Sequence, residues 1–234
     1  EKVRVAHALA ALPRVSATMA RGALSYAKVR AITRVATPET EGALPDFAQF
    51  GLVGREPLTR FRRTVARNMA TSWAIIPHVT LHRWVDVTEL EALRQQLNKL
   101  HGATRGKLTL LPFLARAMVL ALRDFPQINA RFDDEVGVVT RHGAVHLGIA
   151  TQTANGLMVP VLRHAEALDL CACASEIARV AEAARAGKAT REELSGSTIT
   201  LTSLGALGGI ANTPIINAPE VAIVGVNRMV ERPV

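Results

Sequence analysis

Hydrophobic positions towards the end of the chain follow the two-residue repeat of a buried strand. Between residues 198 and 204, β-branched and apolar side chains alternate with small hydroxyl side chains, and residues 221–226 form a second apolar run. Such runs are typical of strands. Glycines at positions 205, 208 and 209 lie between them. The pattern predicts two buried strands joined by a glycine-rich turn.

The first of these strands ends on two adjacent hydroxyl residues, Thr202 and Ser203. A rigid strand end beside glycines can present a hydroxyl at a point where a ligand approaches the backbone closely. Alternatively, both hydroxyls only satisfy neighbouring backbone groups. The pattern alone leaves both interpretations open.

Helical periodicity marks three other stretches. Residues 59–73 carry apolar side chains at every fourth position, so we expect an amphipathic helix there, with four arginines over its remaining surface. Residues 109–125 and 169–186 also predict helices, which end at Pro126 and Gly187. The arginines of the first helix either attract phosphate groups or form a solvated basic face.

The pattern changes between these helices. Residues 76–87 predict a strand, and Thr88 with Glu91 forms a capping box that opens a helix to about residue 100. Residues 136–163 predict short strands broken by glycine-containing turns. We therefore expect an α/β fold. The missing β-α-β rhythm and the missing G-x-G-x-x-G opening argue against a dinucleotide-binding fold.

The composition is that of an ordinary globular protein. Of 234 residues, 49% are hydrophobic and 21% are charged, and no apolar run approaches the length of a membrane span. The first residues lack the apolar centre of a signal peptide, so we expect a cytoplasmic protein. Cys171 and Cys173 fit neither a zinc site nor a C-x-x-C redox pair, and we expect both to be buried as small apolar side chains.

The net charge of +8 is unevenly distributed. Residues 1–41 contain seven Lys or Arg against three Glu, which gives +4, and residues 42–234 contain 21 against 17, which also gives +4. The basic excess is therefore concentrated at the N-terminus, where three short helices are predicted. It indicates either a segment that binds nucleic acid or, since aromatic residues are not interleaved, a solvated helical face.

Five short motifs give the chain a family resemblance. They are I-P-H-V-T at 76–80, D-V-T-E-L at 86–90, G-L-M-V-P-V at 156–161, T-S-L-G at 202–205 and A-P-E-V-A-I at 218–223. With these motifs in this order, residues 44–234 resemble the dihydrolipoamide acyltransferase core of the 2-oxo acid dehydrogenase complexes, a relative of chloramphenicol acetyltransferase. The resemblance implies a chloramphenicol acetyltransferase-like two-layer sandwich with a mixed β-sheet covered by helices.

The activity that this resemblance implies is transfer of an acyl group between dihydrolipoamide and coenzyme A. Such a thioester exchange needs a base for the attacking thiol and a donor for the oxyanion. By its place in T-S-L-G, Thr202 matches the family's oxyanion-stabilising residue. The family's histidine base belongs to a D-H-R-x-x-D-G motif, and none of the seven histidines here stands in it. We therefore expect a C-terminally truncated catalytic domain that is weakly active or inactive alone.

The resemblance also implies a coenzyme A site. Its residues would be Arg94, Thr109, Gln152, Ser203 and Asn227. Gln152 stands where the family has an acidic contact, so it can form hydrogen bonds but brings no charge. No metal is implied, and the lipoyl group would be supplied by a separate lipoyl domain. Whether the acyl group is acetyl or branched-chain stays open.

The N-terminal residues have a different resemblance. With L-P-R at 12–14, G-A-L-S-Y-A-K-V-R at 22–30 and A-T-P-E at 36–39, residues 1–41 resemble the helical domain of unknown function found ahead of HNH endonucleases. We therefore expect a helical appendage of foreign origin over 1–41, a linker over 42–58 and the catalytic domain over 59–234.

Members of this acyltransferase family form their active site between subunits of a trimer, and the trimers assemble into large hollow cores. The expected partners are further copies of the chain, lipoyl domains, and the decarboxylase and dihydrolipoamide dehydrogenase components. The apolar stretch 210–218 either faces a partner subunit or belongs to the core. Two rival hypotheses are a non-catalytic scaffold subunit of such a complex and a nucleic-acid-associated fusion through residues 1–41.

Overall fold

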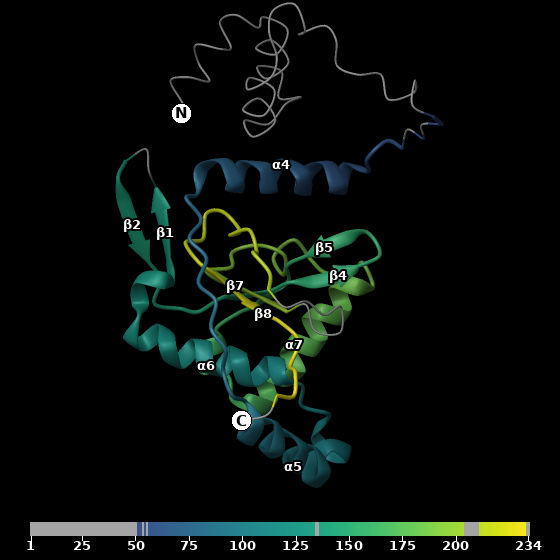
Figure 1. Cartoon of the computed structure of the whole chain (residues 1–234), viewed down its shortest axis with the longest axis vertical. Helices are drawn as coiled ribbons and strands as arrows, with labels where there is room; N and C mark the ends of the chain where they lie inside the picture. The colour runs from purple at the N-terminus through teal and green to yellow at the C-terminus, as the bar shows by residue number, and fades with distance from the viewer. Residues whose placement is uncertain (1–50, 53, 55, 134–135, 204–210, 233–234) are drawn as a thin grey trace, which may run out of the picture. The chain divides into compact units, whose positions relative to one another are not determined.

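The computed structural model describes residues 51–52, 54, 56–133, 136–203 and 211–232 (Figure 1). They belong to two compact units, residues 1–77 and 78–234. The helical appendage predicted for 1–41 lies outside the described residues, as does most of the predicted linker. The predicted domain boundaries therefore stay predictions.

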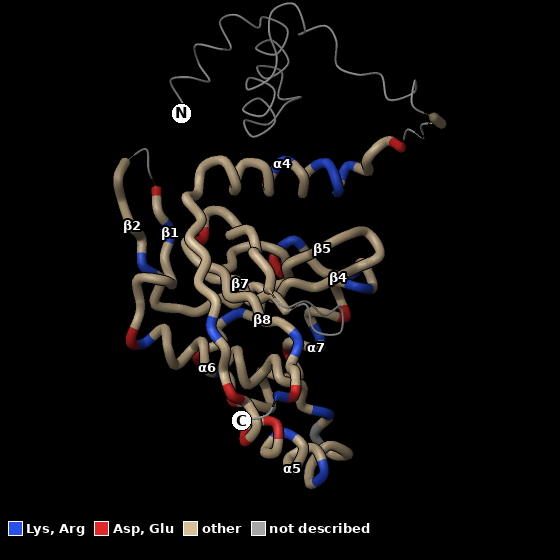
Figure 2. The backbone as a smooth tube through the Cα atoms, viewed as in Figure 1, with Lys and Arg blue, Asp and Glu red and all other residues tan. Residues whose placement is uncertain are grey.

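The described part of the first unit contains the helix α4 (Arg60–Ile75). Thr59 caps its N-terminus, because the Thr59 Oγ1 accepts a hydrogen bond from the N–H of Arg62 at 3.2 Å. Every fourth residue from Phe61 to Met69 is half-buried, which confirms the amphipathic helix predicted for 59–73. Figure 2 shows the basic residues of α4 towards its N-terminal half, and the helix contains no acidic residue.

The second unit begins with residues 78–87, which belong to no helix or strand. The strand predicted for 76–87 is therefore wrong. A strand requires a hydrogen-bonded neighbour, and none of the described strands pairs with this stretch. Its apolar side chains are exposed, including Val79 at 85% and Leu81 at 87%.

The next helix, α5 (Thr88–Arg105), begins differently from the prediction. Val87 occupies the N-cap position and makes no side-chain cap hydrogen bond. Asp86 Oδ1 accepts hydrogen bonds from both the N–H and the Oγ1 of Thr88, at 2.9 and 2.7 Å. Glu91 binds an arginine of the following turn. The predicted capping box between Thr88 and Glu91 is therefore wrong, because each side chain has a nearer partner.

A four-stranded mixed sheet with the order β6-β3-β7-β8 forms the centre of the second unit. Its strands are β3 (Leu147–Ile149), β6 (Val161–Leu162), β7 (Ile199–Ser203) and β8 (Ile223–Val226). β3 pairs antiparallel with β6 and parallel with β7, and β7 pairs parallel with β8. Parallel neighbours require a long crossover connection. The two predicted strands at β7 and β8 are confirmed, although β8 is half-buried, and the glycines of the turn predicted between them lie outside the described residues.

Two antiparallel hairpins complete the strands of the described chain. They are β1 (Ala130–Asp133) with β2 (Val138–Arg141), and β4 (Thr151–Thr153) with β5 (Gly156–Met158). The short strands predicted for 136–163 are confirmed, whereas β1 was not predicted. Two single 3₁₀ turns, η2 (Pro126–Ile128) and η3 (Ala165–Ala167), lie in the connections.

Two helices, α6 (Leu110–Asp124) and α7 (Leu170–Arg185), cover one face of the mixed sheet and confirm the helices predicted for 109–125 and 169–186. Asp169 caps α7 by accepting a hydrogen bond from the N–H of Ala172 at 2.7 Å. The core between helices and sheet contains Ala115, Val119, Leu122, Leu147, Ile149, Leu162, Cys173, Ile177, Ile199 and Leu201. The predicted α/β class is therefore confirmed.

The two cysteines differ in their surroundings. Cys173 is 1% exposed, and burial raises the pKa of its thiol to about 11. Cys171 is only half-buried, and both thiols are free. The expectation that both are buried is therefore correct for Cys173 and wrong for Cys171. Among the helices of the described residues, none combines the length and apolarity needed to cross a membrane.

Candidate active site

Thr202 and Ser203 end β7 and point to opposite faces of the sheet, since side chains alternate along a strand. Ser203 shares its face with Leu201, which is buried in the core below α6 and α7. Thr202 shares its face with Thr200 on the other side. In the pairing register, Thr202 lies beside Gly225. The two adjacent hydroxyls therefore enter different spaces.

Ser203 opens into a cavity of about 320 Å³ at the start of α6. The cavity is lined by Leu110, Leu111, Leu114, Ser203, Val226, Asn227, Arg228 and Met229. Its wall is mostly apolar, and its polar residues are Ser203, Asn227 and Arg228. A site of this kind suits a ligand with an apolar body and a few hydrogen-bonding groups.

Asn227 follows β8 directly and lines this cavity. Its Oδ1 is buried and has no hydrogen-bond partner among the described residues. A buried acceptor without a donor costs free energy, so the site is better satisfied when a bound molecule supplies an N–H or O–H group. Of the predicted residues, Ser203 and Asn227 are therefore brought together at one cavity.

Two further predicted residues lie close to this cavity. Thr109 is next to it in the chain, and Arg94 is close to it in space. Thr109 is the N-cap residue of α6, makes no side-chain cap hydrogen bond, and directly precedes the cavity residue Leu110. Arg94 on α5 donates through Nη1 to the carbonyl of Leu108 at 2.9 Å. The side chain of Asn98 both donates to that carbonyl and accepts from the N–H of Leu108, at 2.9 and 2.7 Å. α5 thus fixes the segment that leads into α6.

The guanidinium of Arg94 is also paired with Glu91. Its Nε and Nη2 donate to the two carboxylate oxygens at 2.7 and 2.6 Å. These hydrogen bonds lower the pKa of Glu91 to about 2 and raise the pKa of Arg94. The hydrogen bonds of the Arg94 guanidinium therefore go to Leu108 and Glu91. The sequence did not predict that Glu91 and Asn98 belong to the same hydrogen-bonded group as Arg94.

Gln152 lies apart from this group. It belongs to β4 in the separate β4–β5 hairpin, and its amide donates to the carbonyl of Thr153 at 3.4 Å. Within the part of the chain that the structure describes, no hydrogen bond joins Gln152 to the other predicted site residues.

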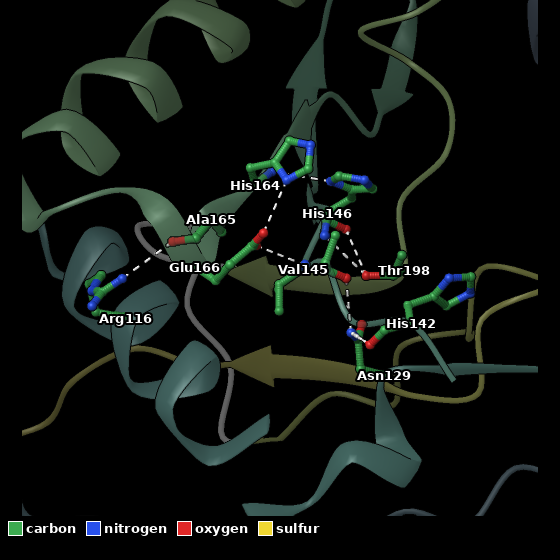
Figure 3. A network of polar contacts seen from close by, with 10 residues as sticks. Arg116, Asn129, His142, Val145, His146, His164, Ala165, Glu166 and Thr198 are labelled. Atoms are coloured by element: carbon green, nitrogen blue, oxygen red, sulfur yellow. Dashed lines mark hydrogen bonds and ion pairs between the residues drawn. The ribbon is translucent and has the colours of Figure 1, made fainter. Parts of the chain in front are cut away.

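Two histidines, His146 and His164, are next to strands of the sheet in the sequence. They lie at the end of the sheet away from Thr202. His146 and His164 pack edge to face, and their ring centroids lie 4.7 Å apart; both residues are labelled in Figure 3. His164 Nδ1 lies 3.0 Å from Glu166 Oε1. The N–H of His146 donates to the Oγ1 of Thr198 at 3.1 Å. Thr202 is four residues further along β7, about 13 Å away at the rise of a strand, so neither ring serves as its base within one subunit.

The protonation of this cluster follows from its surroundings. Burial, then the charges of His164 and Arg163, lower the pKa of His146. Burial acts to raise the pKa of Glu166, but hydrogen bonds, first from the N–H of Val145, outweigh it and lower that pKa. The Nδ1 of His146 accepts from the N–H of His164 at 3.1 Å. The neutral imidazole of His146 and the ionised carboxylate of Glu166 therefore belong to one structural hydrogen-bond network.

Other polar clusters give no metal site. Among the described residues, no group of three His, Cys, Asp or Glu side chains could hold a metal ion. His78 is engaged elsewhere, because its Nε2 accepts a hydrogen bond from the N–H of Ile216 at 2.9 Å.

Residues 52–234 match the family of 2-oxoacid dehydrogenases acyltransferase (catalytic domain). The chain belongs to this acyltransferase family. It is 68% identical over 178 residues to the lipoamide acyltransferase component of the branched-chain alpha-keto acid dehydrogenase complex of Pseudomonas putida. It is 41% identical over 197 residues to the dihydrolipoyllysine-residue acetyltransferase component of the pyruvate dehydrogenase complex of Cupriavidus necator. The matches cover 76% and 82% of this chain, but only 42% and 35% of the relatives.

Solved acyltransferase structures have the same fold. The Azotobacter vinelandii dihydrolipoamide acetyltransferase superimposes with a TM-score of 0.78 at 39% identity, over 81% of this chain and 78% of that one. A truncated catalytic core of the 2-oxoacid dehydrogenase multienzyme complex from Thermoplasma acidophilum gives 0.72 at 35% identity, over 77% and 82%. The predicted chloramphenicol acetyltransferase-like fold is therefore confirmed.

Proposed function

We propose that this chain is an acyltransferase that moves an acyl group between dihydrolipoamide and coenzyme A within a 2-oxo acid dehydrogenase complex. The observation that carries the proposal is the meeting of Ser203 and Asn227 at one cavity beside Thr109, in a chain of the acyltransferase family. The apolar wall suits the methylene and dimethyl groups of the pantetheine arm. The unpaired Oδ1 of Asn227 suits one of its amide N–H groups.

In this proposal Thr202 donates its hydroxyl to the oxyanion that forms when a thiolate attacks the thioester. Its hydroxyl lies on the opposite face of the sheet from Ser203, so in this proposal the thioester reaches Thr202 around the end of β7 and not within the cavity. The base that deprotonates the thiol is the histidine of a D-H-R-x-x-D-G motif, which these 234 residues do not contain. Arg94 and Thr109 contribute through the start of α6, and Gln152 is the weakest member of the set.

We propose a branched-chain acyl group as the substrate. The support is the identity of 68% to a branched-chain component, against 41% to an acetyltransferase component. Further copies of the chain are its first partners, in a trimer within a larger core, since a related structure is that of the cubic core of a pyruvate dehydrogenase complex. Lipoyl domains, the decarboxylase and the dihydrolipoamide dehydrogenase follow from the same assignment, as does the predicted cytoplasmic location.

The test is coenzyme A-dependent transfer from isobutyryl- and acetyl-dihydrolipoamide. It compares the present chain with a version extended by a segment that carries the missing motif. We expect turnover only in the extended form, a preference for the isobutyryl donor, and a loss of about two orders of magnitude in kcat on Thr202→Ala. Thr140→Ala, at an exposed strand position, is the matched control.

The other outcomes separate the rival hypotheses. Calorimetric binding of coenzyme A without turnover in the extended form would favour the scaffold subunit, and absence of both would refute the proposal. Turnover by the present chain alone would show that another base acts. The resemblance of residues 1–41 to the domain ahead of HNH endonucleases stays a separate prediction. Salt-dependent DNA binding that is lost on deletion of that segment would support it.

A further inference from the structure

Glu220 is a buried carboxyl group outside the predicted site. It is 2% exposed. Its Oε1 accepts hydrogen bonds from Ser197 Oγ at 2.5 Å, Thr200 Oγ1 at 2.9 Å and Asn217 Nδ2 at 3.2 Å. Its Oε2 accepts from Thr200 Oγ1 at 2.7 Å. Burying such a group is costly unless its hydrogen bonds are satisfied, and this carboxyl is well supplied with donors.

Two of these donors connect Glu220 to the strand that carries Thr202. Ser197 lies just before β7, and Thr200 lies within it, two residues before Thr202. Thr200 and Thr202 point to the same face because side chains repeat every two residues. Glu220 therefore contacts β7 on the face that presents the proposed oxyanion donor.

The hydroxyl of Thr200 has little freedom on this face. It lies over Gly148 of the neighbouring strand β3, where an added Cβ would be 2.8 Å from Thr200 Oγ1. With the backbone of β3 below it and the Glu220 carboxyl beside it, Thr200 is confined to one position. The strand segment that leads to Thr202 is confined with it.

Glu220 also fixes the strand on the other side of Thr202. It lies three residues before Ile223, the first residue of β8, and Ile223 pairs with Thr200 while Gly225 pairs with Thr202. The contact of Glu220 with Thr200 thus joins the two strands at the start of their pairing. A slip of this register would replace Gly225 beside Thr202 with a larger side chain.

We propose that Glu220 is a positioning residue that acts through Thr200 to place the hydroxyl of Thr202 for the reaction. The proposal rests on the proposed function, because that function assigns Thr202 its task. Glu220 itself does not touch the reacting atoms. Nothing in the family motif A-P-E-V-A-I requires this role, which comes from the four contacts of the carboxyl.

The test uses the extended, active form of the chain and the substitution Thr200→Val, which keeps the shape and removes the hydroxyl. We expect kcat to fall by about one to two orders of magnitude, as a misplacement on the order of 1 Å does, with the KM for coenzyme A changed less than about twofold. We expect Thr200→Ser, which keeps the hydroxyl, to retain the kcat of the parent. We expect the same of Glu220→Gln, which keeps the shape of the side chain and its ability to form hydrogen bonds. Glu220→Leu behaves like Thr200→Val.

A double substitution separates positioning from general damage to the fold. In the Thr202→Ala background, Thr200→Val has no further effect on kcat if it acts through Thr202. An equal loss in both backgrounds overturns the proposal. So does an unchanged kcat in a Thr200→Val variant that binds coenzyme A normally.

Amide hydrogen exchange at Thr202 and Gly225 gives a readout that does not depend on activity. Exchange at both amides accelerates in Thr200→Val and not in Thr200→Ser if the inference holds. Unchanged exchange overturns it, even in a chain that shows no acyl transfer. Failure of the proposed function appears separately, as absence of both coenzyme A binding and turnover in the parent.

Discussion

Thr202 lies beside Gly225 in the parallel pairing of β7 and β8, and a side chain at position 225 would meet the amide of Asn212. A Cβ built on Gly225 would lie 2.7 Å from Asn212 Oδ1, closer than real contacts of this kind. Asn212 and Gly225 therefore bound the space around the proposed oxyanion donor. The backbone of Gly225 does not have a positive φ angle, so the preference for glycine here comes from the Asn212 amide and not from the backbone conformation.

We expect Gly225→Ala to destabilise the fold by about 1 kcal/mol, the low end of the range found for overpacked cores, because the Asn212 amide is the end of a side chain that can move, and to slow acyl transfer. Urea denaturation measures the first effect. Gly143→Ala is the matched control, since nothing lies within 4 Å of its added Cβ. Adding Asn212→Ala to Gly225→Ala removes the clash and should restore stability, and a double variant as unstable as the single one would contradict this account.

Asn227 gives opposite effects on stability and on binding. Asn227→Leu removes the buried, unpaired Oδ1, so we expect the unliganded fold to gain up to about 1 kcal/mol. The same change should weaken coenzyme A binding about three- to tenfold, the value of one hydrogen bond. Denaturation and calorimetry measure the two effects. Asn227→Asp keeps an acceptor and is the control, and unchanged coenzyme A affinity in Asn227→Leu would show that the ligand makes no contact there.

Arg94 should act on coenzyme A binding through Leu108. Both Arg94→Met and Asn98→Leu remove hydrogen bonds to Leu108. We therefore expect both to weaken coenzyme A binding to a similar extent, and Arg123→Met, at an exposed position of α6, to have little effect. Calorimetry at two salt concentrations is the measurement. A larger, salt-dependent loss in Arg94→Met alone would instead indicate a direct phosphate contact.

The sequence contained the local features of this fold. Apolar periodicity predicted α4, α6 and α7, and the first residue of each predicted helix, Thr59, Thr109 or Asp169, occupies the N-cap position. Alternation predicted β7 and β8. These features depend on neighbours within a few residues, which the periodicity of a sequence records directly.

The features that depend on distant residues were not predicted. Residues 78–87 have the pattern of a strand, but a strand also needs a partner. Parallel pairing of β7 with β8 depends on a crossover, which no local signal records. Glu220 escaped notice because a single acidic residue in an apolar stretch shows its donors, Ser197 and Thr200, only after the chain has folded. The same applies to Asn98, whose contact with Leu108 spans ten residues.

The buried carboxyl of Glu220 should make stability depend on pH. Burial raises its pKa above the ordinary value of 4.5, although hydrogen bonds from Ser197, Thr200 and Asn217 act against this shift. Because the folded-state pKa is the higher one, folding favours the protonated form. This contribution is fully present below about pH 4.5 and is lost as the pH rises through the folded-state pKa.

We therefore expect the free energy of unfolding of the parent, relative to Glu220→Gln, to fall as the pH rises from about 4.5 to neutrality. The glutamine carries no proton equilibrium, so its own curve lacks this component. Urea denaturation at intervals across that range is the measurement, and Glu182→Gln, at an exposed position, is the control. If the parent gained stability relative to Glu220→Gln with rising pH, the hydrogen bonds would outweigh burial and the carboxylate would be the preferred form. The ionised group would then hold Thr200 by charge-assisted hydrogen bonds, which are roughly twice as strong as neutral ones.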